Sequence, residues 1–204
     1  GCDYSIIPDQ LEAGSYMVAA AATGGDVLVK NVIPKHLEPI TVKLVMAGAT
    51  VEEFDDSIHV TRSGDIRPVK INTMPHPGFP TDMQPLMSVM LSVAKGTSTV
   101  TEGIWDNRFR YVDELAKMGA NIQVDGQVAV IEGVDSLHPA PLRASDLRAG
   151  AALVVAALMA DGTSEIDEIS HIERGYERIV EKLQALGADI CRVEKGPVAL
   201  SQAL

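Results

Sequence analysis

The residues best suited to chemistry in this sequence are two arginines that occupy the same place in two similar stretches. Arg108 and Arg174 each lie 12 residues after a glycine that ends an apolar stretch, whereas a third such stretch has Leu37 at this point. Both arginines are expected at the start of an amphipathic helix, where a cation opposes the helix dipole. A surface arginine paired with a neighbouring glutamate is the ordinary alternative. Recurrence favours an anion pocket, because arginines and free helix N–H groups both bind phosphate or carboxylate.

An aspartate stands near the start of an apolar helix in the same two stretches. The segments read TDMQ from Thr81 and SDLR from Ser145, so the aspartates are Asp82 and Asp146. Aspartate is an ordinary N-cap residue, and capping is enough to explain both of them. The functional alternative is that Asp82 faces a substrate hydroxyl as a base or hydrogen-bond acceptor, with Arg148 nearby. Spacing by itself leaves both interpretations open.

These side chains belong to a chain that repeats itself three times. Each copy has an apolar helical stretch, a glycine, a short β-branched strand, a second amphipathic helix, a Gly-Ala turn and a final β-hairpin. The period is too long for a thin solenoid repeat. We therefore predict three βαβ-type units around one core, in a single domain over residues 1–204 with units at about 8–68, 69–133 and 139–204.

Periodicity and turn residues predict where the elements lie. Gly48, Gly119 and Gly187 each follow a stretch with helical apolar spacing, as glycines at helix C-termini do. Asp125-Gly126 lies between two β-branched runs and predicts a hairpin with a type I′ turn. The second helix of each copy carries charges on one face and is expected outside. The first helices are apolar nearly all round and are expected in the interior, at about residues 11–23, 82–94 and 146–160.

The composition is that of a globular domain whose charge disfavours several classes of partner. The 204 residues carry a formal net charge of −11, which argues against binding to nucleic acid or to an anionic membrane. The apolar stretch from Ala149 to Ala160 is too short to span a bilayer. Cys2 and Cys191 give no disulfide framework, so a cytoplasmic location is expected. The histidines are scattered singly, so no metal site is predicted.

Four longer strings carry a resemblance to a known family. They are PHPGFPTDMQ from Pro75, NRFRYVDELAKMGA from Asn107, SDLRAGAALV from Ser145 and RGYERIVEKLQALGA from Arg174. Together they closely resemble the UDP-N-acetylglucosamine 1-carboxyvinyltransferases, the enolpyruvyl transferases that begin bacterial peptidoglycan synthesis. The string PDQLEAG is similar to the family's domain-crossing segment, although many members have arginine where this chain has Gln10.

The resemblance implies an α/β fold, an inverted barrel in which three βαβαββ units bury their helices and expose their sheets. Members of the family have two such domains that close on a cleft, and this chain is similar to the domain formed mainly by the C-terminal half. The family's N-terminal Lys-Asn pair and its mobile loop with a reactive cysteine have no match here, and the start at Gly1 resembles a cut inside a longer protein. Neither Cys2 nor Cys191 lies in that loop's motif. The fragment alone is therefore expected to be inactive.

Residue roles also follow from the resemblance. Asp82 is similar to the aspartate beside the 3′-hydroxyl of UDP-N-acetylglucosamine, where it acts as a base or a positioning group. Asp146 is similar to a residue that orients the cleft at the domain interface, and Ile104 to the hydrophobic residue whose backbone contacts the amino sugar. The arginines that surround phosphoenolpyruvate correspond to Arg108, Arg148 and Arg174, and Arg174 joins Asp82 as an expected catalytic residue.

The implied reaction adds the 3′-hydroxyl to C2 of phosphoenolpyruvate with protonation at C3, after which phosphate leaves the tetrahedral adduct. The expected partners are these two substrates and the missing N-terminal-half domain. No metal or organic cofactor is expected, because arginines and helix dipoles offset the developing charge. The alternative is a non-catalytic ligand-binding or assembly module that has kept the fold. The intact strings favour the enzyme, since a module selected only for folding has no need of arginines at helix N-termini.

Overall fold

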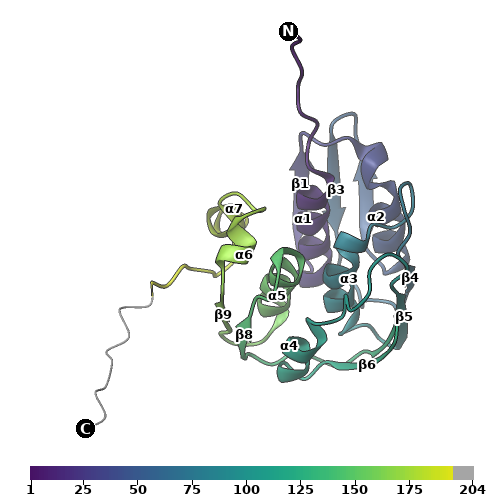
Figure 1. Cartoon of the computed structure of the whole chain (residues 1–204), viewed down its shortest axis with the longest axis vertical. Coiled ribbons are helices and arrows are strands. Elements are labelled where there is room, and N and C mark those ends of the chain that lie inside the picture. Colours follow the sequence, from purple (N-terminus) through teal and green to yellow (C-terminus); the bar gives the residue numbers. More distant parts are fainter. Residues whose placement is uncertain (195–204) are drawn as a thin grey trace.

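The computed structural model describes residues 1–194 and shows three successive α/β units that share one interior (Figure 1). The middle unit has the complete βαβαββ order, and it carries both Asp82 and Arg108. Its elements are β4 (Lys70–Asn72), the 3₁₀ turn η1 (Thr81–Met83) that continues into α3 (Gln84–Leu91), β5 (Thr97–Thr101), α4 (Val112–Lys117), β6 (Asn121–Asp125) and β7 (Val128–Glu132).

The first and third units follow the same plan with differences at the two ends of the chain. The first unit begins directly with a helix and has α1 (Gln10–Thr23), β1 (Asp26–Lys30), α2 (Pro34–Met46), β2 (Thr50–Glu53) and β3 (Ser57–Thr61). The third has β8 (Pro141–Arg143), α5 (Leu147–Met159), β9 (Glu165–Asp167), α6 (Ser170–Glu173) and α7 (Ile179–Ala185). The hairpin expected after α7 lies partly outside the described residues, and residues 188–194 contain no strand.

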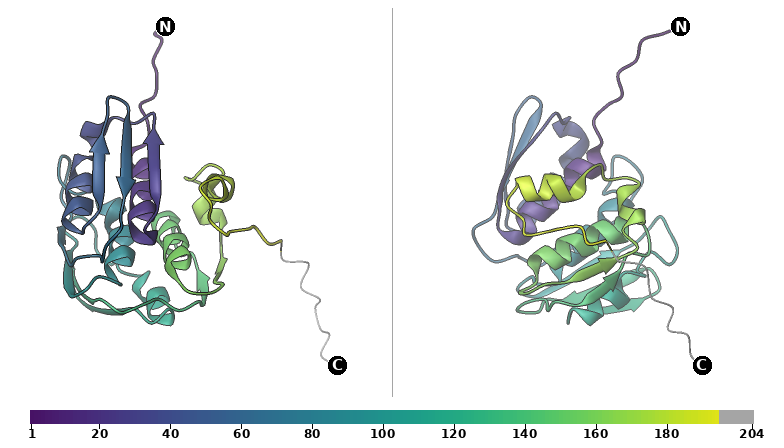
Figure 2. Two further views of the ribbon diagram at one scale, coloured as in Figure 1. Left: turned by 180° about the vertical axis from the view of Figure 1, so that it is seen from behind. Right: turned by 90° about the vertical axis from the view of Figure 1, so that its left-hand side faces the viewer.

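Strand pairing shows a βαβ arrangement in the second and third units. β4 and β5 precede and follow α3 in the sequence and pair with each other as parallel strands. β8 and β9 have the same relation to α5. The remaining pairs are antiparallel, which gives sheets in the orders β1-β3-β2, β4-β5-β7-β6 and β8-β9. The strands lie around the central helices α1, α3 and α5 (Figures 1 and 2). The predicted inverted arrangement, with helices inside and sheets outside, is confirmed.

The three central helices are packed closely enough to explain their apolar sequences. All eight residues of α3 are buried, and most of α1 and α5 is buried as well. Gly14 of α1 lies so close to α2 that a Cβ there would approach Ile40 Cδ1 to 2.7 Å. Gly150 of α5 has the same relation to Ile172, at 2.5 Å. Small residues therefore let the helix starts converge, which brings the polar residues at those starts together.

The hairpin of the middle unit differs from the predicted turn. Asp125 pairs with Val128, so the two loop residues are Gly126 and Gln127. Gly126 has a φ of 56°, whereas Gln127 is not among the residues with positive φ. A type I′ turn needs positive φ at both positions, so this turn fits type II′, which needs it only at the first. The predicted type I′ turn is wrong because pairing continues one residue further than the β-branched runs indicate.

Candidate active site

Asp82 lies at the centre of a cluster of side chains from two different units. Arg108 Nη2 donates a hydrogen bond to Asp82 Oδ1 at 2.8 Å, and Arg148 Nε donates to Oδ2 at 3.2 Å. These partners lie 26 and 66 residues away in the sequence. Pro80 is the N-cap residue of η1 and no side chain caps this turn. The N-cap role that explains Asp82 in sequence terms is therefore wrong, because both carboxylate oxygens face arginines.

Asp146 is the N-cap of α5, as the simpler interpretation predicts. Its Oδ1 accepts the backbone N–H groups of Arg148 and Ala149, both at 2.9 Å. This satisfies two of the amides that every helix leaves free at its first turn. Arg148 lies in that turn, so the cap also fixes the point from which its side chain extends toward Asp82. The expected role of Asp146 in orienting the cleft at a domain interface stays a prediction.

A chain of hydrogen bonds continues from Arg148 into the first unit. Arg148 Nη1 donates to the Tyr176 hydroxyl at 3.4 Å, and this hydroxyl lies 2.7 Å from the hydroxyl of Ser15. Ser15 Oγ gives its single proton to the Leu11 carbonyl, also at 2.7 Å, so Tyr176 is the donor to Ser15. The chain thus runs in one direction from Arg148 to Ser15. Together with Asp82 it joins all three units.

Partial burial strengthens the ion pairs at this cluster. The side chains of Arg148, Arg108 and Asp82 are 14%, 22% and 31% exposed. Burial alone lowers the pKa of Arg148, but the Tyr176 hydroxyl and the Asp82 carboxylate outweigh burial and leave this pKa raised above its ordinary value. Arg148 is therefore a permanent cation that is shielded from solvent on most sides. Such a group suits an anionic ligand in a chain whose net charge is −11.

Arg108 does not begin a helix, and Tyr111 anchors the segment in which it lies. It lies in a turn four residues before α4, which starts at Val112. The Tyr111 hydroxyl donates to Ser88 Oγ at 2.8 Å, and both groups are buried. Because Ser88 is part of α3, this bond fastens the Arg108 segment to the helix that Asp82 precedes. The predicted position at a helix start is wrong for Arg108, since irregular turns separate it from α4.

Arg174 is separate from the Asp82 cluster. It is the C-cap residue of α6, and α7 begins only at Ile179, so the predicted helix start at Arg174 is also wrong. Its side chain is exposed and forms no ion pair with any of the residues that the structure describes. The expected contact of Arg174 with phosphoenolpyruvate stays a prediction. The arginines that the structure shields from solvent and places beside Asp82 are Arg108 and Arg148.

Ile104 lies in a loop that a buried carboxylate organises. Ile104 is 38% exposed, and its backbone N–H donates to Glu102 Oε1 at 2.9 Å. The next residue, Trp105, is 58% exposed and donates its own N–H to the same oxygen at 3.1 Å. Sequence reasoning missed Glu102, Tyr176 and Ser15. Of these, only Glu102 had a recognisable signal, as a single charged residue directly after a β-branched strand.

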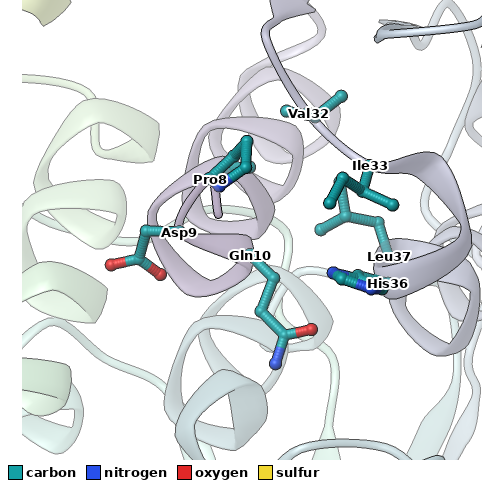
Figure 3. A pocket seen from close by; sticks show the side chains of 8 residues that line it. Pro8, Asp9, Gln10, Val32, Ile33, His36 and Leu37 are labelled. Carbon is teal, nitrogen blue, oxygen red and sulfur yellow. The ribbon is translucent and has the colours of Figure 1, made fainter. Parts of the chain in front are cut away.

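The first unit has no arginine at the corresponding corner. Figure 3 shows a small hollow between the start of α1 and the start of α2, with Leu37 and His36 on one side and Asp9 and Gln10 on the other. Asp9 caps α1 by accepting the N–H groups of the two residues at positions 11 and 12, at 2.8 and 3.2 Å. This corner is mainly apolar, so the first unit contributes Ser15 to the site and no cation.

The Asp82 cluster combines two chemical capacities. Each Asp82 oxygen accepts from one arginine and has a further lone pair, so the carboxylate can still accept a hydrogen bond from a substrate hydroxyl. The guanidinium groups of Arg108 and Arg148 have further N–H donors for an anion. The site therefore suits the meeting of a hydroxyl and an anionic group. No group of three or more His, Cys, Asp or Glu residues among positions 1–194 is arranged to hold a metal ion.

The architecture and this site define one half of the enolpyruvyl-transferase fold. The enolpyruvyl transferase NikO from Streptomyces tendae superimposes with a TM-score of 0.83 at 29% identity, over 92% of this chain and 45% of that protein. EPSP synthase from Acinetobacter baumannii has a TM-score of 0.65 at 18% identity, over 85% of this chain and 44% of that protein, and supports the fold alone.

The chain belongs to the EPSP synthase (3-phosphoshikimate 1-carboxyvinyltransferase) family, whose model matches residues 1–183. UDP-N-acetylglucosamine 1-carboxyvinyltransferase 3 of Caldanaerobacter subterraneus subsp. tengcongensis is 59% identical over 96% of this chain and 47% of its own length. The UDP-N-acetylglucosamine 1-carboxyvinyltransferase of Desulfofundulus thermocisternus is 55% identical over 97% of this chain and 83% of its own length. The chain spans about half the length of most of the relatives it matches. Among residues 1–194, no helix has the length and apolar character needed to cross a membrane.

Proposed function

We propose that this chain is the C-terminal-half domain of an enzyme that transfers the enolpyruvyl group of phosphoenolpyruvate to the 3′-hydroxyl of UDP-N-acetylglucosamine. The observation that carries this proposal is the placement of Asp82 between Arg108 and Arg148, with relatives named for this reaction at 59% and 55% identity. The reaction would be the first committed step of peptidoglycan synthesis. A cytoplasmic location and the absence of a cofactor are part of the same proposal.

In this mechanism Asp82 accepts the hydrogen bond of the 3′-hydroxyl and orients it toward C2 of phosphoenolpyruvate. The 3′-hydroxyl loses its proton as its oxygen bonds to C2, and C3 of the former double bond takes up a proton, so the net change is addition of the O–H group across the double bond. The C2–O bond to phosphate then breaks, C3 loses a proton, and the products are the enolpyruvyl ether and inorganic phosphate. Arg108 and Arg148 bind the phosphate and carboxylate of phosphoenolpyruvate and offset negative charge that develops there. Arg174 supplies a third cation when the second domain closes.

Ile104 binds the amino sugar in the same proposal. Its N–H is already donated to Glu102, so the backbone group left for a ligand is the carbonyl oxygen. Asp146 faces the second domain while it caps α5. The isolated chain is expected to be inactive, because the family's Lys-Asn pair and reactive-cysteine loop have no match in it.

The test is phosphate release from phosphoenolpyruvate and UDP-N-acetylglucosamine. The 204-residue chain alone should release no phosphate above the rate without protein. Adding the N-terminal-half domain of a close relative as a separate chain should restore release that depends on both substrates. A complex that assembles but leaves release at the background rate would favour a non-catalytic ligand-binding or assembly module. Release by the chain alone would contradict the expected need for the other half.

A further inference from the structure

Glu102 is a carboxylate at the end of β5 that is completely buried. Four donors reach it and none of them is a cation. Oε1 accepts from the Thr73 hydroxyl at 2.8 Å and from the two loop amides of Ile104 and Trp105, and Oε2 accepts from the Thr81 hydroxyl at 2.9 Å. Burial of a carboxylate is unfavourable unless such donors replace water, so this complete set of partners is what allows Glu102 to occupy the interior.

Stability alone is a weak reason for this arrangement. A well-packed apolar side chain in the same space commonly gives equal or greater stability than a buried charge with its partners. The partners of Glu102, however, are not scattered through the core. Thr81 directly precedes Asp82, and Ile104 is the residue expected to contact the sugar. One carboxylate therefore ties together the two parts of the site that must act on the same substrate.

The loop after Glu102 is fixed from a second direction as well. The Thr73 hydroxyl donates to Glu102 and accepts the N–H of Gly103 at 2.8 Å. A Cβ at Gly103 would approach the Thr73 carbonyl oxygen to 2.9 Å, so this loop packs directly on the end of β4. With three consecutive amides held in this way, residues 103–105 have little freedom to move relative to η1.

We propose that Glu102 is a positioning residue for the sugar nucleotide. It holds the Ile104 carbonyl and the Asp82 carboxylate at a fixed separation, so that the sugar bound by the loop presents its hydroxyl to Asp82. This inference rests on the proposed transferase function. It assigns Glu102 no contact with a substrate and no proton transfer. It predicts that loosening Glu102 impairs the use of the sugar nucleotide more than the use of phosphoenolpyruvate, which is bound by arginines that Glu102 does not contact.

The first test uses the chain as it is, because Trp105 is its single tryptophan. Time-resolved fluorescence anisotropy of Trp105 reports the nanosecond mobility of the loop. Glu102→Ala should raise the amplitude of the fast decay about twofold or more, and Glu102→Gln, which keeps one acceptor oxygen, should raise it less. Glu132→Ala is the matched control, since Glu132 is exposed on β7 and its carboxylate accepts a hydrogen bond from Asn121 at 2.8 Å. Unchanged anisotropy in folded Glu102→Ala would overturn the inference.

The second test uses the chain combined with the N-terminal-half domain. Glu102→Gln should lower kcat/KM for UDP-N-acetylglucosamine on the order of 10- to 100-fold, as small displacements of a substrate do, with the KM for phosphoenolpyruvate within about threefold. A KM for phosphoenolpyruvate that rises as much as the KM for UDP-N-acetylglucosamine, or a fall in the unfolding midpoint with no kinetic change, would show a structural role and overturn the inference. Inactivity of the unsubstituted assembly would instead refute the proposed function, and the Trp105 measurement would still decide whether Glu102 orders the loop.

A variant at Thr81, which donates to Glu102 Oε2, provides a test if Glu102→Ala does not fold. Thr81→Val removes only the donor to Oε2 and keeps the shape of the side chain. It should reduce kcat while leaving the Trp105 anisotropy unchanged, because the loop amides remain bound to Oε1. If Thr81→Val leaves kcat unchanged in a correctly folded protein, the link between Glu102 and Asp82 is wrong.

Discussion

Replacing Asp82 with asparagine tests whether its carboxylate has a structural role or a catalytic one. Asparagine keeps one acceptor oxygen for one arginine but turns an NH₂ group toward the other, so one of the two charge-assisted hydrogen bonds at 2.8 and 3.2 Å is lost. Such a bond contributes about 1.5–3 kcal/mol when buried. Because Asp82 is 31% exposed and water can partly replace the lost partner, we expect a loss of about 1–2 kcal/mol in the free energy of unfolding.

Urea unfolding of the 204-residue chain, followed by circular dichroism, measures this loss directly. Turnover in the reassembled two-domain enzyme should fall by roughly two to four powers of ten, the range for a general base or its equivalent. Asp135→Asn serves as the control, because Asp135 is almost fully exposed and pairs with Lys95, which is outside the Asp82 cluster. If Asp82→Asn keeps turnover within about threefold while the chain loses stability, Asp82 is only a bridge between arginines and the mechanism is wrong.

Three further substitutions test other parts of the structure. Tyr176→Phe removes the hydroxyl that joins the third unit to the first and should cost about 1–2 kcal/mol in urea unfolding, whereas no loss would contradict the hydrogen-bond chain. The pKa of His59 is raised by hydrogen bonds to Asp26 and Glu52, so its stabilising effect is complete below its ordinary pKa of 6.5 and is lost as pH rises through the raised value. His59→Gln should flatten that part of the stability–pH curve, and an unchanged curve would contradict this. Gly14→Ala should cost about 1–3 kcal/mol through crowding against α2, and a neutral effect on the unfolding midpoint would show that the helices yield there.

Much of the fold could be predicted because its signals are local. Apolar helices, β-branched strands and the glycines at positions 48, 119 and 187 place most elements correctly, and all three glycines have positive φ. The errors arise where local signals compete. Asp82 has the sequence context of a helix cap, but the two arginines that approach it offer stronger partners than a backbone amide does. The type I′ prediction is wrong because strand pairing extends to Asp125 and Val128, past the residue that was expected to begin the turn.

The sequence by itself determined the threefold repeat, the interior helices, the family and most of the candidate residues. Only the tertiary structure decided which of those residues meet. Arg108 and Arg148 reach Asp82, Arg174 does not, and Glu102 joins the site through partners up to 29 residues away. The physical reason is that helices and turns depend on neighbouring residues. A buried ion pair or carboxylate depends on partners that only the packing of distant elements brings within hydrogen-bond distance.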